Sequence, residues 1–307
     1  MFGMSNLVLM IITIVAATIG SIVNAIFPKR FYMTPYTAWR YTFYKSFFGL
    51  VSIALMYLAA GADFTLSIFS VLLGLWLAVC CSCSIFVLTK AYETGPVTYT
   101  SVIIALSAII PTFSGLFLFG EAVTPIQYAG VVLMAICLVL SVDTGKEHKA
   151  KKANAKWLIY CAVGFVFSGS VGVIQKIHQN SAAHKAEMPA LLLTAFLVSS
   201  VISATGLLTQ VKSKPDKSIP EYAVNSKKFI IYPIITGAFW GVNHVINLPL
   251  AHIIPSVVFF PLVNLSPTIL LALYAVIIYG ERMSRRRWVG LIVGFLSVIL
   301  LSGVIKF

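Results

Sequence analysis

Charged residues are scarce in this chain. They make up 10% of the sequence, and only nine acidic residues stand against 22 basic ones. A soluble domain carries about 25% charged residues, so this chain lacks the polar side chains needed to cover a surface that faces water on all sides. Apolar residues reach 59%, and the mean hydropathy is +0.96. The chain is therefore expected to lie in a lipid bilayer.

Cysteines and catalytic motifs are also few. All five cysteines fall within or beside apolar stretches, and the Cys80-x-x-Cys83 pair has no second cysteine or histidine pair to complete a metal site. Buried packing is the expected role of these thiols. The chain has no phosphate-binding Walker motif and no constellation typical of an intramembrane enzyme. We therefore expect neither an enzyme nor an ATP-driven pump, and neither a cofactor nor a metal.

Long apolar runs are abundant instead. A membrane-spanning helix needs roughly 20 mostly apolar residues, and ten such runs can be placed. Their continuity excludes a β-barrel, whose strands alternate apolar and polar residues over about ten positions. The sequence therefore predicts an all-α polytopic membrane protein with ten transmembrane helices. The predicted spans are residues 5–27, 36–60, 66–89, 96–119, 126–142, 157–175, 189–209, 229–251, 256–279 and 288–304.

The placement of the basic residues predicts the topology. Of the 22 basic residues, 17 lie in the odd-numbered loops between spans, whereas the even-numbered loops and both ends hold only Lys176, Lys185 and Lys306. Basic loops stay in the cytoplasm, so both termini are expected outside. The net charge of +13 is thereby explained as a topology signal, and no nucleic-acid partner is expected. The first span has no basic residue before it, unlike a cleaved signal peptide.

Two matched cassettes indicate an internal duplication. An aromatic-Gly-Glu-x-x-Thr/Ser pattern occurs at residues 119–124 and again at 279–284, and a glycine follows each glutamate by nine residues, at Gly130 and Gly290. Duplicated hydrophobic halves are common in membrane transporters. Five spans precede the basic linker and five follow it, so the second repeat must be inverted relative to the first. The predicted organisation is a first repeat at 1–143, a linker at 144–156 and a second repeat at 157–307.

These features resemble the drug/metabolite transporter superfamily and, within it, the EamA-like family. The resemblance rests on ten spans in two inverted halves and on a Pro/Gly-interrupted fourth span that closes on Gly-Glu, and it covers nearly the whole chain. Arg40 resembles an arginine common in the second span of the family, and Pro267 lies about where the family places a proline. One departure is that the charge count places the first Gly-Glu loop outside. The resemblance implies a secondary transporter whose central cavity lies among spans one, three, four, six, eight and nine.

The richest polar stripe lies on the eighth span. Its members are spaced at i, i+3, i+4 and i+7 and are Trp240, Asn243, His244 and Asn247. Facing lipid, the amides and the imidazole would lose their hydrogen bonds, so they are expected to face the bundle interior or a wet cavity. A purely structural network between helices is the alternative. Because a tryptophan that can stack on a ligand joins them, the four together favour a substrate cavity.

Other candidate lining residues are isolated. They are Asn24, Gln175, Asn264 and Tyr99, and each is also compatible with a packing amide or an interfacial tyrosine. Glu121 and Glu281 of the two cassettes are predicted structural corners, with gating or proton coupling as the alternative. Arg40 and Lys45 are expected near an end of the second span, where their side chains reach the headgroups.

The distribution of charge favours one class of substrate. No acidic residue occupies the middle of a span, and no pair of basic residues marks a phosphate site. The expected substrates are therefore neutral or zwitterionic small organic metabolites, such as amino acids or nucleoside-like solutes, carried by alternating access around a midplane cavity. His244 is the mid-span group that titrates near neutral pH and is the candidate for proton coupling. The alternative on the same fold is a lipid-carrier flippase.

The expected partners and location follow from the same features. They are a small-molecule substrate and membrane lipids, with the chain acting as a monomer or homodimer in the plasma (inner) membrane. Gly290 and Gly294 form a Gly-x-x-x-Gly pattern on the last span, which predicts close helix packing either within the chain or between two protomers.

Overall fold

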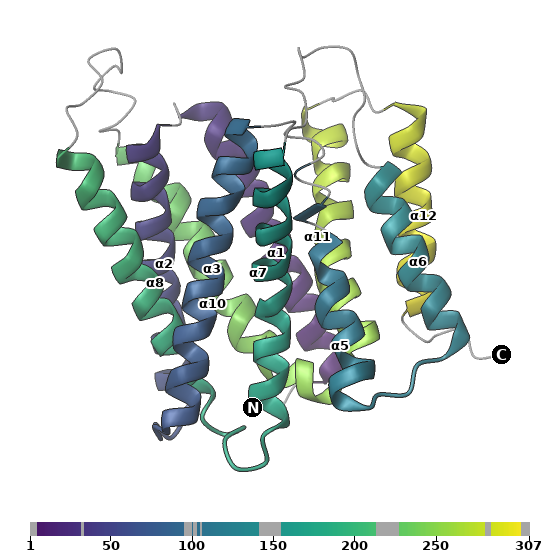
Figure 1. Ribbon diagram of the computed structural model, residues 1–307, viewed down its shortest axis with the longest axis horizontal. Coiled ribbons are helices and arrows are strands. Elements are labelled where there is room, and N and C mark those ends of the chain that lie inside the picture. The colour runs from purple at the N-terminus through teal and green to yellow at the C-terminus, as the bar shows by residue number, and fades with distance from the viewer. Residues whose placement is uncertain are drawn as a thin grey trace. The chain divides into compact units, whose positions relative to one another are not determined.

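The computed structural model describes residues 5–31, 34–94, 100, 103–104, 106–140, 155–212, 227–279 and 284–301. Throughout these ranges the regular structure is helical, with ten α-helices, the short 3-10 turn η1 (Leu106–Ala108) and no strand (Figure 1). The α-helices are α1 (Asn6–Arg30), α2 (Pro35–Ala59), α3 (Ile68–Thr94), α5 (Ile109–Phe119), α6 (Pro125–Leu140), α7 (Ala155–Asn180), α8 (Met188–Lys212), α10 (Lys227–Ile253), α11 (Ser256–Tyr279) and α12 (Arg285–Leu301).

The helices confirm the predicted class of an all-α, multi-pass membrane protein. Six of them are long and apolar enough to cross a bilayer, and shorter apolar stretches occupy the remaining predicted spans, at Ile68–Ser84, Leu106–Phe119, Pro125–Cys137 and Trp288–Leu301. Large apolar side chains such as Phe117 and Ile68 are more than three-quarters exposed, at 82% and 80%, as lipid-facing groups are. Helices α3 and α7 continue well past the predicted ends of their spans: α3 to Thr94, beyond residue 89, and α7 to Asn180, beyond residue 175.

The chain divides into two compact units, each of which is described by itself. The first contains Met1–Ser82 and His178–Leu250, and the second contains Cys83–Ile177 and Ala251–Phe307. Each unit therefore combines segments from both predicted repeats. The repeat boundaries at 143 and 157 concern the duplication of the sequence and remain a prediction.

In the first unit, α2 and α10 cross at glycines. A Cβ on Gly237 would collide with the carbonyl oxygen of Lys45, and one on Gly241 would lie 2.7 Å from the carbonyl oxygen of Gly49. The Ser52 hydroxyl donates a hydrogen bond of 3.1 Å across the crossing to the carbonyl oxygen of Ala238. Small residues let helix backbones approach closely in a bilayer, so this crossing holds the middle of α10 directly against α2.

Also in the first unit, α2 lies antiparallel to α8 (Figure 1). Near the start of α2, Trp39 packs over Gly206 near the end of α8, where a Cβ would approach the indole ring to 2.6 Å. Further along α2, Gly49 faces Phe196 in the first half of α8. Contacts that pair the start of one helix with the end of the other establish opposite chain directions.

The second unit contains a matching antiparallel pair, α6 and α12 (Figure 1). Gly130, near the start of α6, packs against Leu301 at the end of α12, and Gly290, near the start of α12, packs against Leu140 at the end of α6. The Ser297 hydroxyl donates to the carbonyl oxygen of Gly130 at 2.8 Å. The glycines that the sequence aligns as equivalent therefore lie at two ends of one helix pair, and close packing of Gly290 occurs within the chain.

Gly237→Ala tests the helix crossing. Alanine has the higher helix propensity by about 1 kcal/mol, but its methyl group would meet the backbone of α2 at Gly237. We expect a loss of about 1–3 kcal/mol of stability, seen as a lower unfolding temperature in detergent. Gly20→Ala is the matched control, because a Cβ at Gly20 meets nothing within 4 Å. Equal unfolding temperatures for the two variants would contradict the close crossing.

Candidate functional site

The polar stripe on α10 divides into two sets of contacts in the first unit. Trp240 lies 13 residues from each end of the 27-residue helix, and Asn243, His244 and Asn247 follow it toward the C-terminus. His244 and Asn247 are buried, at 7% and 8% exposure, whereas Trp240 and Asn243 stay partly exposed. The stripe thus lies inside the protein, as the sequence predicts from the cost of exposing amides to lipid.

The two asparagines bind α1 and each other. Asn243 Nδ2 donates to the carbonyl oxygen of Thr13 at 3.2 Å, and the Thr13 hydroxyl donates to Asn247 Oδ1 at 3.0 Å. Asn247 Nδ2 then donates to Asn243 Oδ1 at 2.8 Å, which closes the ring of hydrogen bonds. This ring joins α1 to α10 and has the form of the interhelical network that was the alternative to a substrate cavity.

The aromatic members of the stripe face α8. The Trp240 ring lies 4.6 Å from that of Phe196 and 5.3 Å from that of His244, measured between centroids. The His244 and Phe196 rings are 5.4 Å apart and nearly perpendicular. Such edge-to-face contacts fix ring orientation, so Trp240 presents a defined, partly exposed surface in the middle of its helix.

Lys45 of α2 adjoins this aromatic group, a contact that the sequence analysis did not predict. Its Nζ lies 4.3 Å from the centre of the Trp240 ring, a cation–π contact. Lys45 follows the first residue of α2 by ten positions and precedes the last by 14, so it lies near the middle of the helix rather than near an end. The expectation that Lys45 reaches the headgroups is therefore wrong, because the glycine crossing directs its ammonium along α10.

The other predicted residues of the first unit lie toward the cytoplasmic loop expected after α1. Asn24 is exposed, and its Oδ1 accepts a hydrogen bond of 2.5 Å from the Tyr41 hydroxyl, which also lies 2.9 Å from Thr236 Oγ1. The Arg40 guanidinium stacks over the Phe229 ring at 4.7 Å. These contacts link α1, α2 and α10 through an aromatic cluster.

The remaining predicted residues belong to the second unit or lie outside the description. Gln175 is buried on α7, at 4% exposure. Asn264 is exposed on α11, and its Nδ2 donates to the carbonyl oxygen of Phe260 in the same helix at 2.7 Å. Tyr99 and Glu281 fall outside the described residues.

The first Gly-Glu cassette forms a tight corner in the second unit. Gly120 ends α5 with a φ of 62°, a left-handed conformation that favours glycine. Thr124 then caps α6: its hydroxyl accepts from the Gln127 amide at 3.3 Å, and Gln127 Oε1 accepts from the Thr124 amide at 3.0 Å. Glycine at the turn and threonine at the cap are the residue types that such a corner favours.

Glu121 in that corner is held by two other elements of the same unit. Its Oε2 accepts from the backbone amide of Ser256, the first residue of α11, at 2.6 Å, and its carboxylate forms an ion pair with Lys176 of α7. Lys176 is only 2% exposed and also donates to the carbonyl oxygen of Ile254 at 3.4 Å. A carboxylate at a helix N-terminus is favoured by the helix dipole, so this pair, whose lysine is buried and whose carboxylate is 16% exposed, joins α7, the corner and α11.

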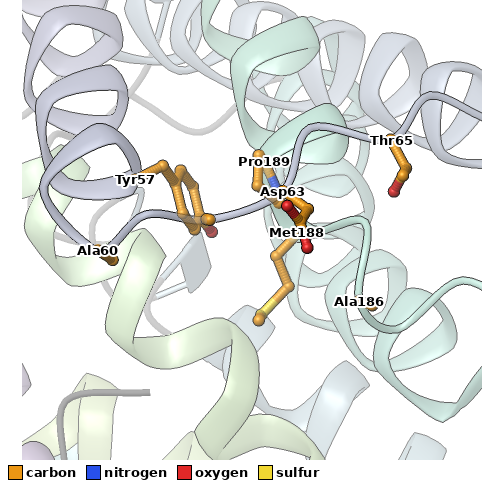
Figure 2. Close-up of a pocket in the computed structure, with 8 residues that line it drawn as sticks. Tyr57, Ala60, Asp63, Thr65, Ala186, Met188 and Pro189 are labelled. Atoms are coloured by element: carbon orange, nitrogen blue, oxygen red, sulfur yellow. The ribbon is translucent and has the colours of Figure 1, made fainter.

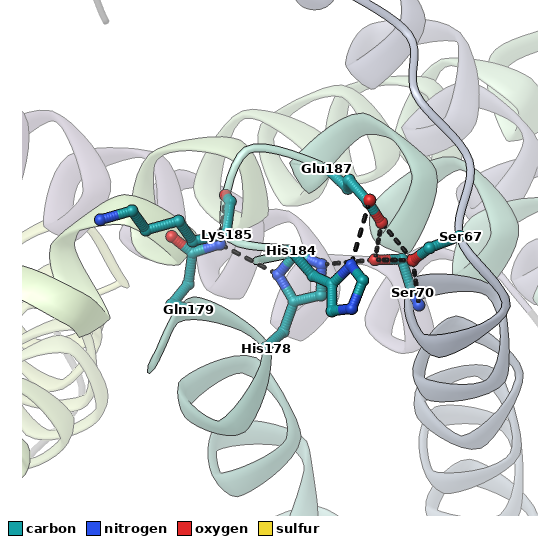
Figure 3. Close-up of polar contacts among 7 residues, drawn as sticks. All are labelled: Ser67, Ser70, His178, Gln179, His184, Lys185 and Glu187. Atoms are coloured by element: carbon teal, nitrogen blue, oxygen red, sulfur yellow. Dashed lines mark hydrogen bonds and ion pairs between the residues drawn. The ribbon is translucent and has the colours of Figure 1, made fainter. Parts of the chain in front are cut away.

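A polar cluster that the sequence analysis missed joins three helix ends in the first unit (Figure 3). Glu187, just before α8, accepts from the hydroxyls of Ser67 and Ser70 at the start of α3, the latter at 2.5 Å, and lies 3.1 Å from His184 Nδ1. Ser70 is 117 residues from Glu187 in the chain. Nothing in the local sequence links two serines to so distant a glutamate.

The same cluster defines the tautomer of His178. The Ser70 hydroxyl donates its proton to Glu187, so it must accept from His178 Nε2, which lies 3.0 Å away. His178 Nδ1 then accepts from Gln179 Nε2, also at 3.0 Å. A neutral imidazole with its proton on Nε2 satisfies every bond in this chain.

A pocket of about 520 Å³ lies beside this cluster (Figure 2). Its lining comes from the end of α2, the following loop and the start of α8, and consists of Tyr57, Ala60, Ala62, Asp63, Thr65, Ala186, Met188 and Pro189. Among the described residues, Tyr57 Oη is a buried polar atom without a hydrogen-bond partner. The pocket therefore combines an exposed carboxylate with one unsatisfied hydroxyl.

Glu121 and Lys176 are expected to be energetically coupled. Removal of one partner leaves a buried charge uncompensated, which costs about 3–5 kcal/mol. We therefore expect Glu121→Gln and Lys176→Met each to lower the unfolding temperature strongly, and the double variant to lose less than the sum of the two. Additive losses in such a double-mutant cycle would show that the pair is not coupled.

Glu187 predicts a dependence of stability on acidic pH. Hydrogen bonds from Ser67 and then Ser70 lower the pKa of Glu187 from 4.5 to about 2, against an opposing effect of burial and with a smaller contribution from His184. Stability from this carboxylate is fully present above about pH 4.5 and is lost as the pH falls toward 2. We expect the unfolding temperature of Glu187→Gln to fall less than that of the wild type across this window.

A second variant separates this effect from general acid sensitivity. Ser67→Ala with Ser70→Ala removes the two hydroxyl donors and should raise the pKa of Glu187, so the loss of stability should begin at a higher pH. Identical pH profiles for the wild type and both variants would exclude Glu187 as the source of the loss of stability at acidic pH.

Comparisons with known proteins agree with this architecture. Residues 155–303 match the model of the EamA-like transporter family. A comparison with curated proteins finds no match. Among solved structures 28 chains match, and one of them, a crystal structure of a protein, has a TM-score of 0.68 at 14% identity, covering 96% of this chain and 98% of that one. That likeness concerns the fold alone. The family match confirms, over residues 155–303, the resemblance to the EamA-like transporter family that was drawn from the sequence.

Proposed function

We propose that the protein is a secondary transporter of small organic metabolites, working by alternating access around a cavity that includes the middle of α10. Members of the EamA-like family are membrane transporters. The observation that carries the proposal is the partly exposed Trp240 surface at the centre of α10, flanked by His244 and by the Lys45 ammonium. Polar and ionisable groups at membrane depth mark substrate or ion pathways.

Two inverted repeats are part of this proposal. Support comes from the helix pairs within each unit: α2 is antiparallel to α8, and α6 is antiparallel to α12. In each pair one helix comes from the first predicted repeat and the other is its counterpart in the second. Antiparallel counterparts are what an inverted duplication requires, and alternating access commonly operates between such repeats.

The proposed location is the plasma membrane, with both termini outside. The support is the distribution of basic residues, 17 of which lie in the odd-numbered loops. The proposed substrates are neutral or zwitterionic, such as amino acids or nucleoside-like solutes. His244, which contacts both Trp240 and Phe196, is the proposed group for proton coupling.

Transport by purified protein in liposomes tests the function. We expect uptake of at least one labelled amino acid or nucleoside above that of empty liposomes, and a loss of about ten-fold or more in Trp240→Ala, because base or side-chain stacking on tryptophan contributes about 1–3 kcal/mol. Trp76→Ala is the matched control, since Trp76 is 52% exposed on α3. Equal uptake by both variants would place the substrate site elsewhere.

The pH dependence of the same uptake tests proton coupling. If His244 exchanges the coupled proton, an inward proton gradient should stimulate the wild type and leave His244→Gln unaffected, because glutamine cannot titrate. The control is Trp76→Ala, which should keep the response of the wild type. A gradient response preserved in His244→Gln would remove His244 from the coupling step.

A further inference from the structure

We infer that the Lys45 ammonium binds a carboxylate of the transported substrate, so that the substrates are small organic carboxylates, zwitterionic amino acids included, rather than uncharged nucleoside-like solutes. This inference rests on the proposed transport function and assigns the polar contact of its site. Three observations support it: the position of Lys45, the neighbours of its ammonium, and the absence of an anionic partner for that ammonium among the described residues.

Lys45 lies at the depth where a charge is most costly. It follows Pro35 by ten residues in a helix of 25, which at 1.5 Å per residue is roughly 15 Å from the start of α2. Trp240, its contact, is at the midpoint of α10. A lysine near a helix end keeps its ammonium at the headgroups, but this lysine is held against the centre of a neighbouring helix.

The ammonium has no anionic partner in the described part of the chain. The ion pairs there are Lys176 with Glu121 and His184 with Glu187, and the contact that Lys45 makes is with the face of the Trp240 ring. Among the described residues, the Lys45 ammonium is therefore left without an acidic group to neutralise it.

The surroundings of Lys45 favour a carboxylate over a phosphate. A phosphate is usually held by two or more cations or by a bidentate arginine, whereas the nearby Arg40 is stacked on Phe229 at 4.7 Å. One lysine matches the single negative charge of a carboxylate. Trp240, whose ring packs on the buried His244 and Phe196, is partly exposed beside Lys45 and can contact the apolar part of the same molecule.

A lipid headgroup is the other source of an anion near a lysine. Lipid phosphates lie at the membrane surfaces, about 15 Å from the bilayer centre, whereas Lys45 is near the middle of α2. A solute that enters the middle of the bundle reaches Lys45 more directly than a headgroup does.

Thermal unfolding of the purified protein in detergent tests the inference. The probes are L-phenylalanine, L-leucine and benzoate, each compared with its amide, together with inorganic phosphate and a short-chain phosphatidylglycerol, at about 20 mM so that millimolar binding is visible. We expect at least one carboxylate, and not its amide, to raise the unfolding temperature. In Lys45→Met the same shift should need at least about ten-fold more ligand, because a charge-assisted contact is lost. Lys45→Arg keeps the charge and should retain part of the shift.

Matched variants and a second assay keep the result decisive. Lys156→Met removes an exposed lysine at the start of α7 and should behave as the wild type. Stabilisation by acid and amide alike, by phosphate or lipid alone, or equally in Lys45→Met would overturn the inference, as would the absence of stabilisation by every carboxylate. Counterflow in liposomes, in which a solute inside exchanges for the same solute outside, separates the two proposals. If the amides exchange, and exchange equally well in Lys45→Met, the protein is a transporter without this subsite. If none of the probes exchanges, the proposed transport itself is contradicted.

Discussion

Where α2 crosses α10, no side chain separates the two backbones. A Cβ on Gly237 would collide with the carbonyl oxygen of Lys45, and one on Gly241 would press on Gly49. Because the helices are this close, the Lys45 side chain has no room between them and extends along α10 until its ammonium rests on Trp240. The candidate site of the first unit therefore depends on three glycines that bind nothing themselves, and its charge lies at mid-helix as a consequence of backbone packing.

Polar groups inside the helical bundle fall into two classes. Asn243, Asn247 and Thr13 satisfy one another in a closed ring. Glu121 and Lys176 neutralise each other at the end of α7. Such satisfied groups hold helices together at little cost in hydration. Lys45 differs because its ammonium has an aromatic neighbour but no anion in the described part of the chain. An incomplete electrostatic arrangement at membrane depth is the feature expected of a group that meets a ligand.

The two halves that the sequence analysis aligns as repeats carry different polar groups. Gly130 and Gly290 have the same role. Each allows α6 and α12 to pack closely, Gly130 at one end of this antiparallel pair and Gly290 at the other. The first cassette adds a carboxylate that caps α11 and pairs with Lys176. On α10 the polar stripe carries an aromatic surface and an amide ring, whereas its counterpart on α3 carries small residues such as Cys80 and Ser84. Equivalent packing with unequal polar groups is compatible with the proposed transport of an asymmetric solute by alternating access.

The sequence by itself determined the elements of this fold. Continuous apolar runs specify spanning helices because a bilayer offers the backbone no other hydrogen-bond partner, and the Gly120 turn and the Thr124 cap follow from residue type. Periodicity also placed Trp240, Asn243, His244 and Asn247 on one inward face. Only the tertiary structure decided how these groups are used. In the folded chain, the two asparagines bind Thr13, and Ser67 and Ser70 donate hydrogen bonds to Glu187. Lys45 contacts the Trp240 ring, whereas the sequence predicted that it would reach the membrane surface. Each of these contacts joins segments distant in the chain, and helix packing determines such contacts whereas local sequence does not.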